Sequence, residues 1–358
     1  MNTAATMRWV CTVCGYVHEG PEPPEECPVC GAGPDLFEAE AEPGTTDSAS
    51  PGTPAPEEYL AAWARDTDGF ETKFARIKAL ASGAPSEISP MRTQQPFPSW
   101  ESVLFRGAQL ARLPRNEDEP VNTRTVLGRS AAKPLAIAMP FYVSHMSFGA
   151  LSREAKIALA RGSRMAGTLI CSGEGGLLPE ERAEAALYIY ELGTATFSHR
   201  DDAIRQADAV EIKIGQAAKP GLGGHLPAEK VTEEIARVRG IPAGHDSVSP
   251  GRFSGINTKG DLKTVAERVR GLLDGKPLGI KLTASHVEDD LADALEAGPD
   301  FITIDCRGGA TGAAPTYIKD NVCLPPVFAL YRARKFLDRA GSRVTLCVTG
   351  GFRDSADI

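Results

Sequence analysis

The chain has 358 residues, of which 42% are hydrophobic and 24% are charged, and its formal net charge is −8. This composition is typical of a globular protein, and the acidic balance argues against nucleic acid as the main partner. No run of about 18 residues is continuously apolar, and the first residues lack the apolar core of a signal peptide, so we expect a cytoplasmic protein without a membrane span.

The first predicted element is a cluster of four cysteines within residues 9–32. Cys11 and Cys14 form one C-x-x-C pair, Cys27 and Cys30 form a second, and a glycine follows each pair directly. Glycine lets the backbone turn with positive φ and lets amide groups approach the sulfurs. Four thiolates in this pattern suit zinc or a single iron better than disulfides. Because so short a segment has little core, we expect the metal to keep it folded.

The residues around these cysteines resemble a known family. The stretch CGYVHEGPEPPEECPVCGA is similar to the rubredoxin-like domain of the rubrerythrin family over about residues 8–38, and Tyr16, Gly20 and Pro28 match as well. The resemblance implies a redox-active iron, with a structural zinc as the alternative. We therefore predict a rubredoxin-like domain over residues 1–38, with these metal ligands: Cys11, Cys14, Cys27 and Cys30.

The next part of the chain has no such motif. Residues 39–57 are rich in Pro, Ser, Thr, Gly and acidic residues, and this composition predicts a flexible linker, with a structured loop as the alternative. Apolar residues at helical spacing predict a helix over residues 57–82. We assign residues 58–130 to a helical and irregular extension that precedes the main domain.

From residue 131 onward, short apolar strands alternate with amphipathic helices. The predicted strands lie at residues 133–144, 168–174, 209–215, 277–283, 301–306 and 343–351, with a shorter one at 245–250. The predicted helices lie at residues 152–167, 259–275, 287–298 and 326–341. This alternation predicts parallel βα units and a (β/α)8 barrel that stops after its seventh strand; a doubly wound open sheet is the alternative.

Glycine-rich and polar motifs follow most of the predicted strands. They are SHMSFGALS (144–152), CSGEGG (171–176), KIGQAAKPGLGG (213–224), KLT (281–283), CRGGATGAAP (306–315) and VTGG (348–351). Glycines permit tight turns and let backbone amides approach a ligand. Because the carboxyl ends of barrel strands meet at one face, we expect these motifs to converge on one site.

These motifs, in this order, resemble the FMN-binding synthase domain of the glutamate synthase family and its stand-alone archaeal-type relatives. The similarity runs from about residue 95 onward, and QAAKPGLGGHLPAEKV is its most specific part. The resemblance implies an FMN-binding barrel. It also implies an oxidoreductase that reduces the imine formed from 2-oxoglutarate and ammonia, giving glutamate.

The resemblance assigns roles to individual residues. Lys281 is expected to stabilise the negative charge of reduced flavin, although a lysine there can equally pair with a barrel carboxylate. Lys213 and Lys219 suit a dicarboxylate substrate, with a solvated loop charge as the alternative for Lys219. The predicted catalytic residues are Glu174, Lys213, Gln216 and Lys219. The predicted FMN-binding residues are Met146, Ser147, Gly149, Ser172, Gln216, Lys281, Gly308, Gly309, Gly350 and Gly351.

Several positions depart from the family pattern and leave the substrate open. Cys306 and Arg307 stand where the family has a His-Asp pair, Thr349 replaces an Asp, and SPGRFSGINTKGDL replaces a loop rich in proline and histidine. The family's three-cysteine iron–sulfur segment is also not found, so we expect a fragment or a split protein. A flavoenzyme acting on glutamate and an amine, and a non-catalytic electron-transfer or scaffold subunit, therefore remain alternatives.

The remaining predictions concern partners and isolated residues. No amidotransferase-like region is recognised, so ammonia is expected from solution or from an amidotransferase subunit. Electrons are expected from a donor protein or an NAD(P)H reductase, and the iron centre is expected to pass them to FMN. The linker would raise the local concentration of the iron-binding domain at the barrel. Cys171, Cys306, Cys323 and Cys347 are expected to act as buried small hydrophobes. Among the six scattered histidines, His145 in the first loop motif is the one candidate for a functional role, and a structural role is favoured for it.

Overall fold

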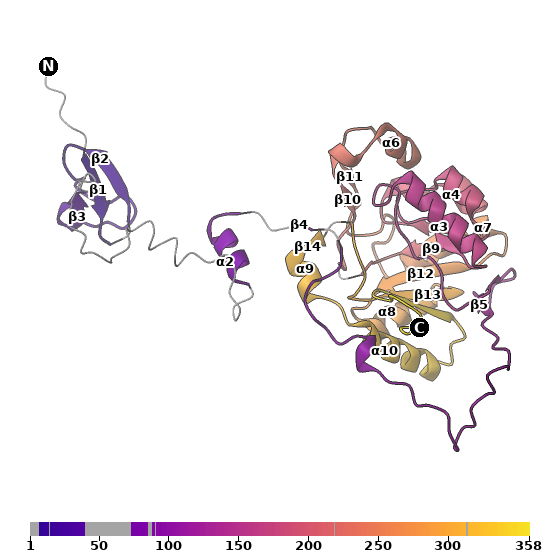
Figure 1. Cartoon of the computed structure of the whole chain (residues 1–358). Helices are drawn as coiled ribbons and strands as arrows, with labels where there is room; N and C mark the ends of the chain where they lie inside the picture. The colour runs from indigo at the N-terminus through magenta and orange to yellow at the C-terminus, as the bar shows by residue number, and fades with distance from the viewer. Residues whose placement is uncertain are drawn as a thin grey trace. The chain divides into compact units, whose positions relative to one another are not determined.

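The computed structural model describes residues 7–13, 15–39, 73–84, 88–89, 91–217, 219–312 and 314–358. They belong to two compact units, Met1–Ser82 and Gly83–Ile358 (Figure 1). Within these described ranges, no helix is both long enough and apolar enough to cross a bilayer.

The first unit contains a small three-stranded antiparallel sheet. β1 (Met7–Cys11) is the central strand, and β2 (Val17–Gly20) and β3 (Phe37–Ala39) pair with it on either side. A short 3-10 helix, η1 (Pro34–Leu36), leads into β3. The core consists of Cys11, Cys27, Ala32 and Phe37, with Trp9 and Tyr16 packed against it. So few apolar side chains cannot stabilise a domain alone, which agrees with the expectation that a metal contributes to folding.

Among the described residues of this unit, the α-helix is α2 (Phe74–Ala81), which buries none of its residues. It covers the last part of the helix predicted over residues 57–82. Residues 57–72 of that prediction, and nearly all of the predicted linker, lie outside the described residues.

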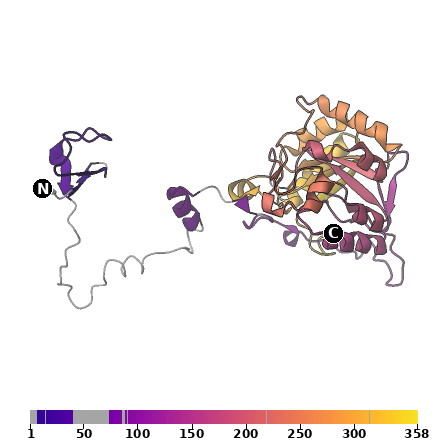
Figure 2. The ribbon, with the colours of Figure 1, turned by 90° about the horizontal axis from the view of Figure 1, so that it is seen from above.

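The second unit is built on a six-stranded parallel sheet with the order β15-β13-β12-β9-β8-β7. Its strands are β7 (Ile170–Cys171), β8 (Tyr188–Leu192), β9 (Ala209–Lys213), β12 (Leu278–Thr283), β13 (Phe301–Asp305) and β15 (Thr345–Thr349). The order follows the chain without reversal, which excludes a doubly wound sheet. The sheet curls into a half-barrel, as predicted for the larger part of a (β/α)8 barrel (Figure 2).

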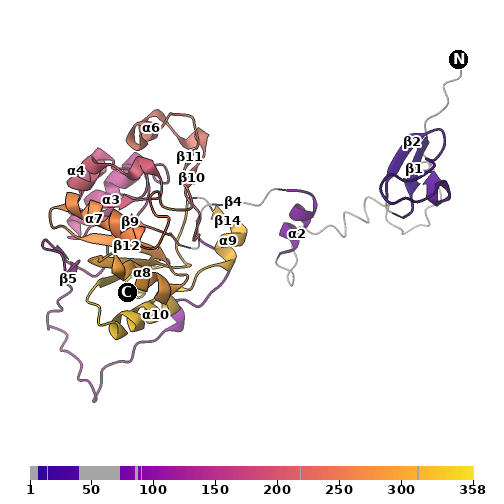
Figure 3. The same ribbon diagram turned by 180° about the vertical axis from the view of Figure 1, so that it is seen from behind.

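Helices cover the outer face of this sheet (Figure 3). α3 (Arg153–Met165) packs on β7, α7 (Asp261–Leu273) on β9 and β12, α8 (Val287–Glu296) on β12, and α10 (Pro326–Arg339) on β13 and β15. The shorter helices are α4 (Pro179–Glu184), α5 (Asp201–Gln206), α6 (Glu233–Arg239) and α9 (Thr316–Asn321). The two short strands β10 (His225–Leu226) and β11 (Ser247–Val248) pair antiparallel and flank α6 in the chain. Figures 1 and 3 show this excursion at one end of the unit.

Three strand assignments needed correction. β8 lies in residues 180–193, to which no strand was assigned, because the segment begins with the helix α4 and is rich in alanine. The strand predicted at residues 245–250 is β11, which belongs to the antiparallel pair and not to the barrel. In residues 133–144, β6 (Leu135–Ile137) forms a hairpin with β5 (Thr125–Leu127), and only Val143 joins the barrel, through a bridge to Ile170.

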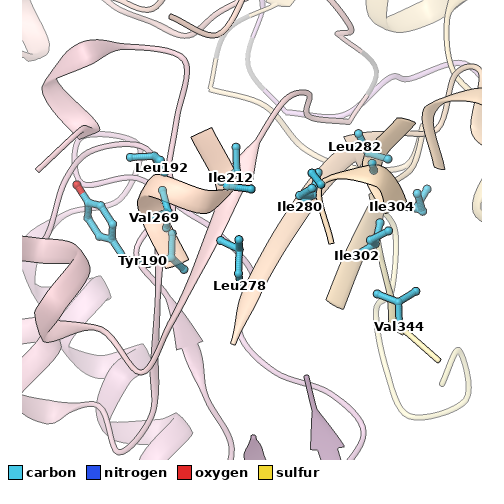
Figure 4. Close-up of a cluster of buried hydrophobic side chains, with 14 of the residues drawn as sticks. Tyr190, Leu192, Ile212, Val269, Leu278, Ile280, Leu282, Ile302, Ile304 and Val344 are labelled. Atoms are coloured by element: carbon cyan, nitrogen blue, oxygen red, sulfur yellow. The ribbon is translucent and has the colours of Figure 1, made fainter. Parts of the chain in front are cut away.

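The apolar core lies on both sides of the strands. Toward the helices, alternate strand residues such as Ile212, Ile280 and Ile302 are fully buried, as the close-up in Figure 4 shows. At the other side, Leu127, Leu135 and Ile137 of the β5–β6 hairpin pack with Ile189 and Phe301 and close the amino-terminal end of the barrel. These residues cover the amino-terminal end of the barrel interior, and the cavity described below opens at the carboxyl ends of the strands.

An entry segment, residues 88–93, joins the barrel near those carboxyl ends. β4 (Ile88–Ser89) pairs antiparallel with β14 (Ala314–Pro315), and the amide of Met91 donates to the carbonyl of Thr311 at 2.8 Å. The buried hydroxyl of Thr93 donates to Asp320 Oδ1 at 2.7 Å. Met91 has φ +69°, a left-handed conformation that is costly for a residue with a Cβ and is here held by these contacts.

The four cysteines of this unit behave as predicted in part. Cys171 and Cys306 are buried, whereas Cys323 and Cys347 are half-buried. Burial raises the pKa of the Cys171 and Cys306 thiols, so both favour the protonated form.

Candidate functional site

The cysteine cluster of the first unit is formed by two matching turns. The Gly15 amide donates to the carbonyl of Cys11 and the Gly31 amide donates to that of Cys27, both at 2.9 Å. The two glycines have φ +78° and +74°, which only glycine adopts without strain. The glycine after each cysteine pair therefore has the conformational role predicted for it.

These turns bring the described cysteines together at one point. The sulfur atoms of Cys11, Cys27 and Cys30 all lie within 4.8 Å of one another, and Cys11 Sγ is 3.7 Å from Cys30 Sγ. Metal–sulfur bonds of about 2.3 Å at a tetrahedral centre place neighbouring sulfurs about 3.8 Å apart, so the spacing fits a bound metal. Cys14, the fourth predicted ligand, lies outside the described residues.

A cavity of about 440 Å³ opens at the carboxyl ends of the barrel strands. The loop after Val143, the loops after β7 and β9, the β10–α6 excursion and the entry segment all contribute to its walls. Four cations line it (Lys213, Lys219, Lys230 and Arg239) against two carboxylates (Glu174 and Glu191), with His145 and His225 in addition. In a chain with a net charge of −8, this locally positive lining favours an anionic ligand.

The structure brings together seven of the predicted site residues on this cavity. They are Met146, Ser147, Gly149, Glu174, Lys213, Gln216 and Lys219. The other six, Ser172, Lys281 and the two glycine pairs, are not part of its lining. The predicted convergence thus agrees with the geometry for the loops after the first, second and third predicted strands, and the loop after Asp305 adds Ala310, Thr311 and Gly312, whereas the two glycine pairs lie outside the lining.

The residues outside the lining have internal contacts. Ser172 is fully buried, and its hydroxyl accepts the amide of Glu191 and donates to the Gly173 carbonyl. A Cβ on Gly308 would lie 2.5 Å from the carbonyl oxygen of Gly350, so these two turns need glycine in order to pack together. The Gly309 amide is already used, because it donates to the Cys306 carbonyl.

Lys281 is also held internally. Its ammonium lies 3.1 Å from Asp305 Oδ2 and 4.0 Å from Glu191 Oε2, with all three side chains at most 7% exposed. Burial alone would lower the pKa of Lys281, but the carboxylates of Asp305 and Glu191 outweigh it and raise the pKa. This is the pairing with a barrel carboxylate that was weighed as the alternative for Lys281.

Lys213 connects the cavity to the barrel interior. Its Nζ lies 2.7 Å from Glu174 Oε2 and 3.2 Å from Glu191 Oε1. Burial would raise the pKa of both carboxyl groups, but the Lys213 ammonium outweighs it, lowering the pKa of Glu174 and bringing that of Glu191 to about 2. Both carboxylates are therefore ionised at neutral pH.

Lys219 has a different environment. Its Nζ donates to the Gly223 carbonyl at 3.1 Å, and the residue is 4% exposed. Burial, aided by repulsion from Lys213, lowers the pKa of Lys219 to about 8. A lysine with a disfavoured charge in an accessible cavity is typical of a functional position.

Sequence reasoning missed several residues of this site. His145 lies 3.0 Å from Glu191 and 2.6 Å from Glu211 inside the barrel, although neither contact has hydrogen-bond geometry. Glu191 and Glu211 occupy inward positions of β8 and β9, and no sequence motif marks either of them. Arg239 on α6 donates to Ser247 Oγ and the Phe148 carbonyl, and no sequence motif marks it.

Lys156 fixes the first two loops of the cavity from behind. Its buried ammonium donates to the carbonyls of Met146 and Ser172 at 2.7 and 2.8 Å, and it pairs with Glu181 at 2.8 Å. Tyr188 donates to the other oxygen of Glu181 at 2.9 Å. Met146 and its neighbours are therefore held in place before any ligand binds.

Buried polar atoms without hydrogen bonds concentrate at the cavity. Among the described residues, six buried side-chain nitrogen or oxygen atoms have no such partner, and four belong to cavity residues: His145 Nε2, Glu174 Oε1, Glu191 Oε2 and Arg239 Nε. Two of the four have charged neighbours inside the barrel, because His145 Nε2 lies 2.6 Å from Glu211 and Glu191 Oε2 lies 3.0 Å from His145. The acceptor Glu174 Oε1 and the donor Arg239 Nε are therefore the two atoms that a ligand would satisfy.

The two units match two separate families. The model of the conserved region in glutamate synthase matches residues 84–358, and that of the rubrerythrin, rubredoxin-like domain matches residues 9–38. The chain belongs to the glutamate synthase family. Its amino-terminal unit is a rubredoxin-like domain, so both predicted resemblances are confirmed.

Curated relatives agree with this assignment. A glutamate synthase large subunit-like protein of Rhizobium meliloti is 34% identical over 290 residues, covering 80% of this chain and 66% of that protein. An archaeal-type glutamate synthase [NADPH] of Thermotoga maritima is 37% identical, covering 80% and 56%. The archaeal glutamate synthase [NADPH] of Archaeoglobus fulgidus is 35% identical, covering 72% and 56%. The match therefore spans about half to two thirds of the length of these relatives.

Proposed function

We propose that this chain is a flavin-dependent oxidoreductase that reductively aminates 2-oxoglutarate to glutamate, with electrons passing from an iron centre to FMN. The observation that carries the proposal is the positively charged cavity, in which a predicted substrate lysine and a buried arginine line one wall. The family assignment supports the general class of reaction, and the named substrate and electron path are our inference.

The cavity residues fit a flavin in charge and in hydrogen bonding. The backbone and small side chains of Met146, Ser147 and Gly149 would pack against its ring system. Gln216 lies at the same rim, where its amide donates to the Ala310 carbonyl at 3.4 Å. When bound, FMN supplies a hydride equivalent and thus two electrons. For its phosphate, Gly308, Gly350 and Gly351 remain the proposed amide donors.

The substrate carboxylates would bind to Lys219 and Arg239. Within the described ranges, the Arg239 guanidinium has no carboxylate partner, although its residue is only 6% exposed. Its fixed fork of donors suits a carboxylate. Lys213 is less suited to this role than predicted, because Glu174 and Glu191 already neutralise it.

Glu174 would position the nitrogen of the substrate. It is ionised and faces the cavity, and one of its oxygens lacks a hydrogen-bond partner. An ionised carboxylate attracts ammonium and iminium groups, and Lys213 keeps Glu174 in this form. Glu174 and Lys213 would therefore work as one unit.

In the first unit we propose iron, held by Cys11, Cys14, Cys27 and Cys30, with zinc as the alternative. The rubredoxin-like family supports a redox role, and the sulfur spacing suits either metal. We further propose the boundaries 1–38 for this domain, 39–57 for a linker, 58–130 for the barrel extension and 131–358 for the barrel itself.

The test uses the purified full chain. We expect a visible spectrum with both iron–thiolate and flavin bands, and glutamate formation from 2-oxoglutarate and ammonium with a reduced donor, such as an NADPH-dependent reductase. Lys219→Met is expected to raise KM for 2-oxoglutarate at least tenfold, whereas Lys259→Met, a control on the outer surface, is expected to leave it unchanged. Turnover of glutamate plus an amine, without ammonium-dependent activity, would replace the proposed substrate pair. Absence of flavin after reconstitution would favour a scaffold subunit.

The electron path needs a separate experiment. Serine at both Cys11 and Cys14 should slow donor-dependent FMN reduction by at least tenfold while leaving reduction by dithionite unchanged. Equal rates in the two proteins, with every donor tested, would remove the iron centre from the path.

A further inference from the structure

A histidine and an aspartate form a pair on the short hairpin that flanks the cavity. His225 begins β10 and lines the cavity, and its Nε2 lies 2.9 Å from Asp246 Oδ2. The pairing of His225 with Val248 and of Leu226 with Ser247 places Asp246 beside the ring. Both side chains are partly exposed, at 40% and 52%, so solvent can exchange protons with the pair.

The contacts of Asp246 determine which ring nitrogen carries hydrogen. Its second oxygen, Oδ1, accepts the Ala228 amide at 2.7 Å. The hydrogen bond from His225, together with that amide, lowers the pKa of Asp246, so the carboxylate is ionised and acts as the acceptor. His225 Nε2 must then be the donor, which leaves Nδ1 as the nitrogen that can take up or release a proton.

The hairpin is tied to the charged part of the cavity. The Ser249 amide donates to the Gly224 carbonyl at 2.9 Å, and a hydrogen bond from the Ser249 side chain helps to stabilise the ionised form of Glu174. A Cβ on Gly224, the residue before His225, would lie 3.5 Å from Glu174 Oε2. The other charged or titratable groups that line the cavity are Glu191, Lys213, Lys219, Lys230, Arg239 and His145.

We propose that His225, oriented by Asp246, is the acid–base residue for the nitrogen chemistry that precedes reduction. Resting on the proposed function, the inference names two proton transfers by His225. His225 Nδ1 first accepts a proton from ammonium, and the ammonia released forms a C–N bond with the carbonyl carbon as the C=O π bond opens onto oxygen. One proton of the added nitrogen then moves to that oxygen, which gives the neutral carbinolamine. In the resulting carbinolamine, His225 returns that proton to the hydroxyl; the C–O bond breaks, water leaves, and the nitrogen lone pair forms the C=N bond of the iminium ion. The proton taken up in the first transfer is the one released in the second.

The experiment compares His225→Gln, Asp246→Asn and His245→Gln in the full chain loaded with iron and FMN. His245 is a matched control, because it is exposed in the same loop and does not line the cavity. We expect His225→Gln to lower kcat/KM for ammonium 10²–10³-fold, the usual range for loss of an acid–base group. Asp246→Asn should lower it by at least tenfold, and both variants should lose the acidic limb of the pH profile. His245→Gln should match the wild type.

Two further measurements separate this inference from the function on which it rests. The Kd for 2-oxoglutarate, measured by calorimetry, should change less than threefold in His225→Gln, and added imidazole should restore activity to His225→Ala. If His225→Gln turns over at the wild-type rate with an unchanged pH profile, or loses 2-oxoglutarate binding instead, the acid–base role is overturned. A wild-type protein that binds no 2-oxoglutarate and shows no ammonium-dependent turnover would overturn the proposed function itself.

Discussion

Along each long strand of the parallel sheet, alternate side chains enter two different environments. In β12, Leu278, Ile280 and Leu282 face the helices and belong to the apolar core, whereas Lys281 faces the barrel interior and pairs with Asp305. β8 and β9 show the same division, with Glu191 and Glu211 on the inner side. The outer face is stabilised by removal of apolar surface from water, and the inner face by mutual neutralisation of charges that are costly to bury.

This difference explains how one sheet can serve both folding and chemistry. When a side chain on the outer face is truncated, the protein loses the packing contacts of that side chain. No charge is left unpaired, because the neighbouring side chains are apolar. Loss of an inner side chain leaves a partner charged and unpaired in a medium of low polarity. The two faces should therefore respond differently to substitution and to pH.

The largest expected effect comes from breaking an inner ion pair. Lys281→Met leaves Asp305 and Glu191 without this cation and should lower the free energy of unfolding by about 3–5 kcal/mol. The additional change Asp305→Asn should recover most of that loss, because it removes the unpaired charge. Urea unfolding of the full chain, followed by circular dichroism, measures both variants. A loss below about 1 kcal/mol in the single variant would show that the inner charges are not tightly coupled.

Lowering the pH should reduce the free energy of unfolding by a similar amount. The pKa of Glu191 is about 2 in the folded protein and near 4.5 when unfolded, so between these values the unfolded chain binds more protons. Stability should therefore fall as pH drops from about 4.5 toward 2, by about 3 kcal/mol from this group alone. Glu191→Gln should show a shallower decline over this window in urea titrations at successive pH values. Parallel curves for the two proteins would contradict the assignment.

A smaller effect of opposite sign is expected at the cavity. The pKa of Lys219 is about 8 when folded, below its usual 10.5, so at pH 7 the buried ammonium destabilises the fold. Lys219→Met should raise the free energy of unfolding by about 2 kcal/mol at pH 7, after allowance for the lost bond to Gly223. Between pH 8 and 10.5 only the unfolded wild type keeps this proton, so wild-type stability rises with pH and the difference should shrink. Equal stability at pH 7 would argue against a destabilising charge.

The outer face should show the smallest change. Ile280→Val removes one methyl group from the core and should cost about 1 kcal/mol, independent of pH. Leu104→Ala removes more carbon from a side chain that is 89% exposed, and it should change the free energy of unfolding by less than about 0.5 kcal/mol. If the loss of free energy of unfolding in Ile280→Val depended on pH, the proposed difference between the two faces would be contradicted.

The sequence predicted those features that depend on local chemistry. The metal turns could be recognised because cysteine spacing and the glycines at positive φ are local requirements, and the parallel sheet because apolar runs alternate with amphipathic helices. β8 was missed because it is buried on both faces and follows an alanine-rich helix, so no period of two is visible. β11 was placed in the barrel because a short extended stretch does not reveal its partner.

The missed site residues share a physical cause. Arg239 and Asp246 lie in the excursion between β9 and β12, where helix packing places Arg239 at the cavity and antiparallel pairing places Asp246 beside His225, and no short motif encodes either placement. His225 stands within the motif QAAKPGLGGHLPAEKV, but the motif alone gave it no role. Gly308, Gly309, Gly350 and Gly351 were predicted from a local pattern, but the structure gives that pattern another cause. The two turns pack so closely that they need glycine whether or not a phosphate binds there. Local sequence patterns thus identified candidate site residues. The packing of segments that are distant in the sequence determined which of those residues lie together at the cavity.

The entry segment has a consequence for ligand binding in the barrel unit. Met91 forms part of the cavity wall, and its amide donates to the carbonyl of Thr311, which also lines the cavity. β4 pairs with β14 just beyond Thr311, so the segment and the loop after β13 are joined at two places. The entry segment is therefore also part of the ligand enclosure, and a substitution that breaks either contact would change ligand affinity.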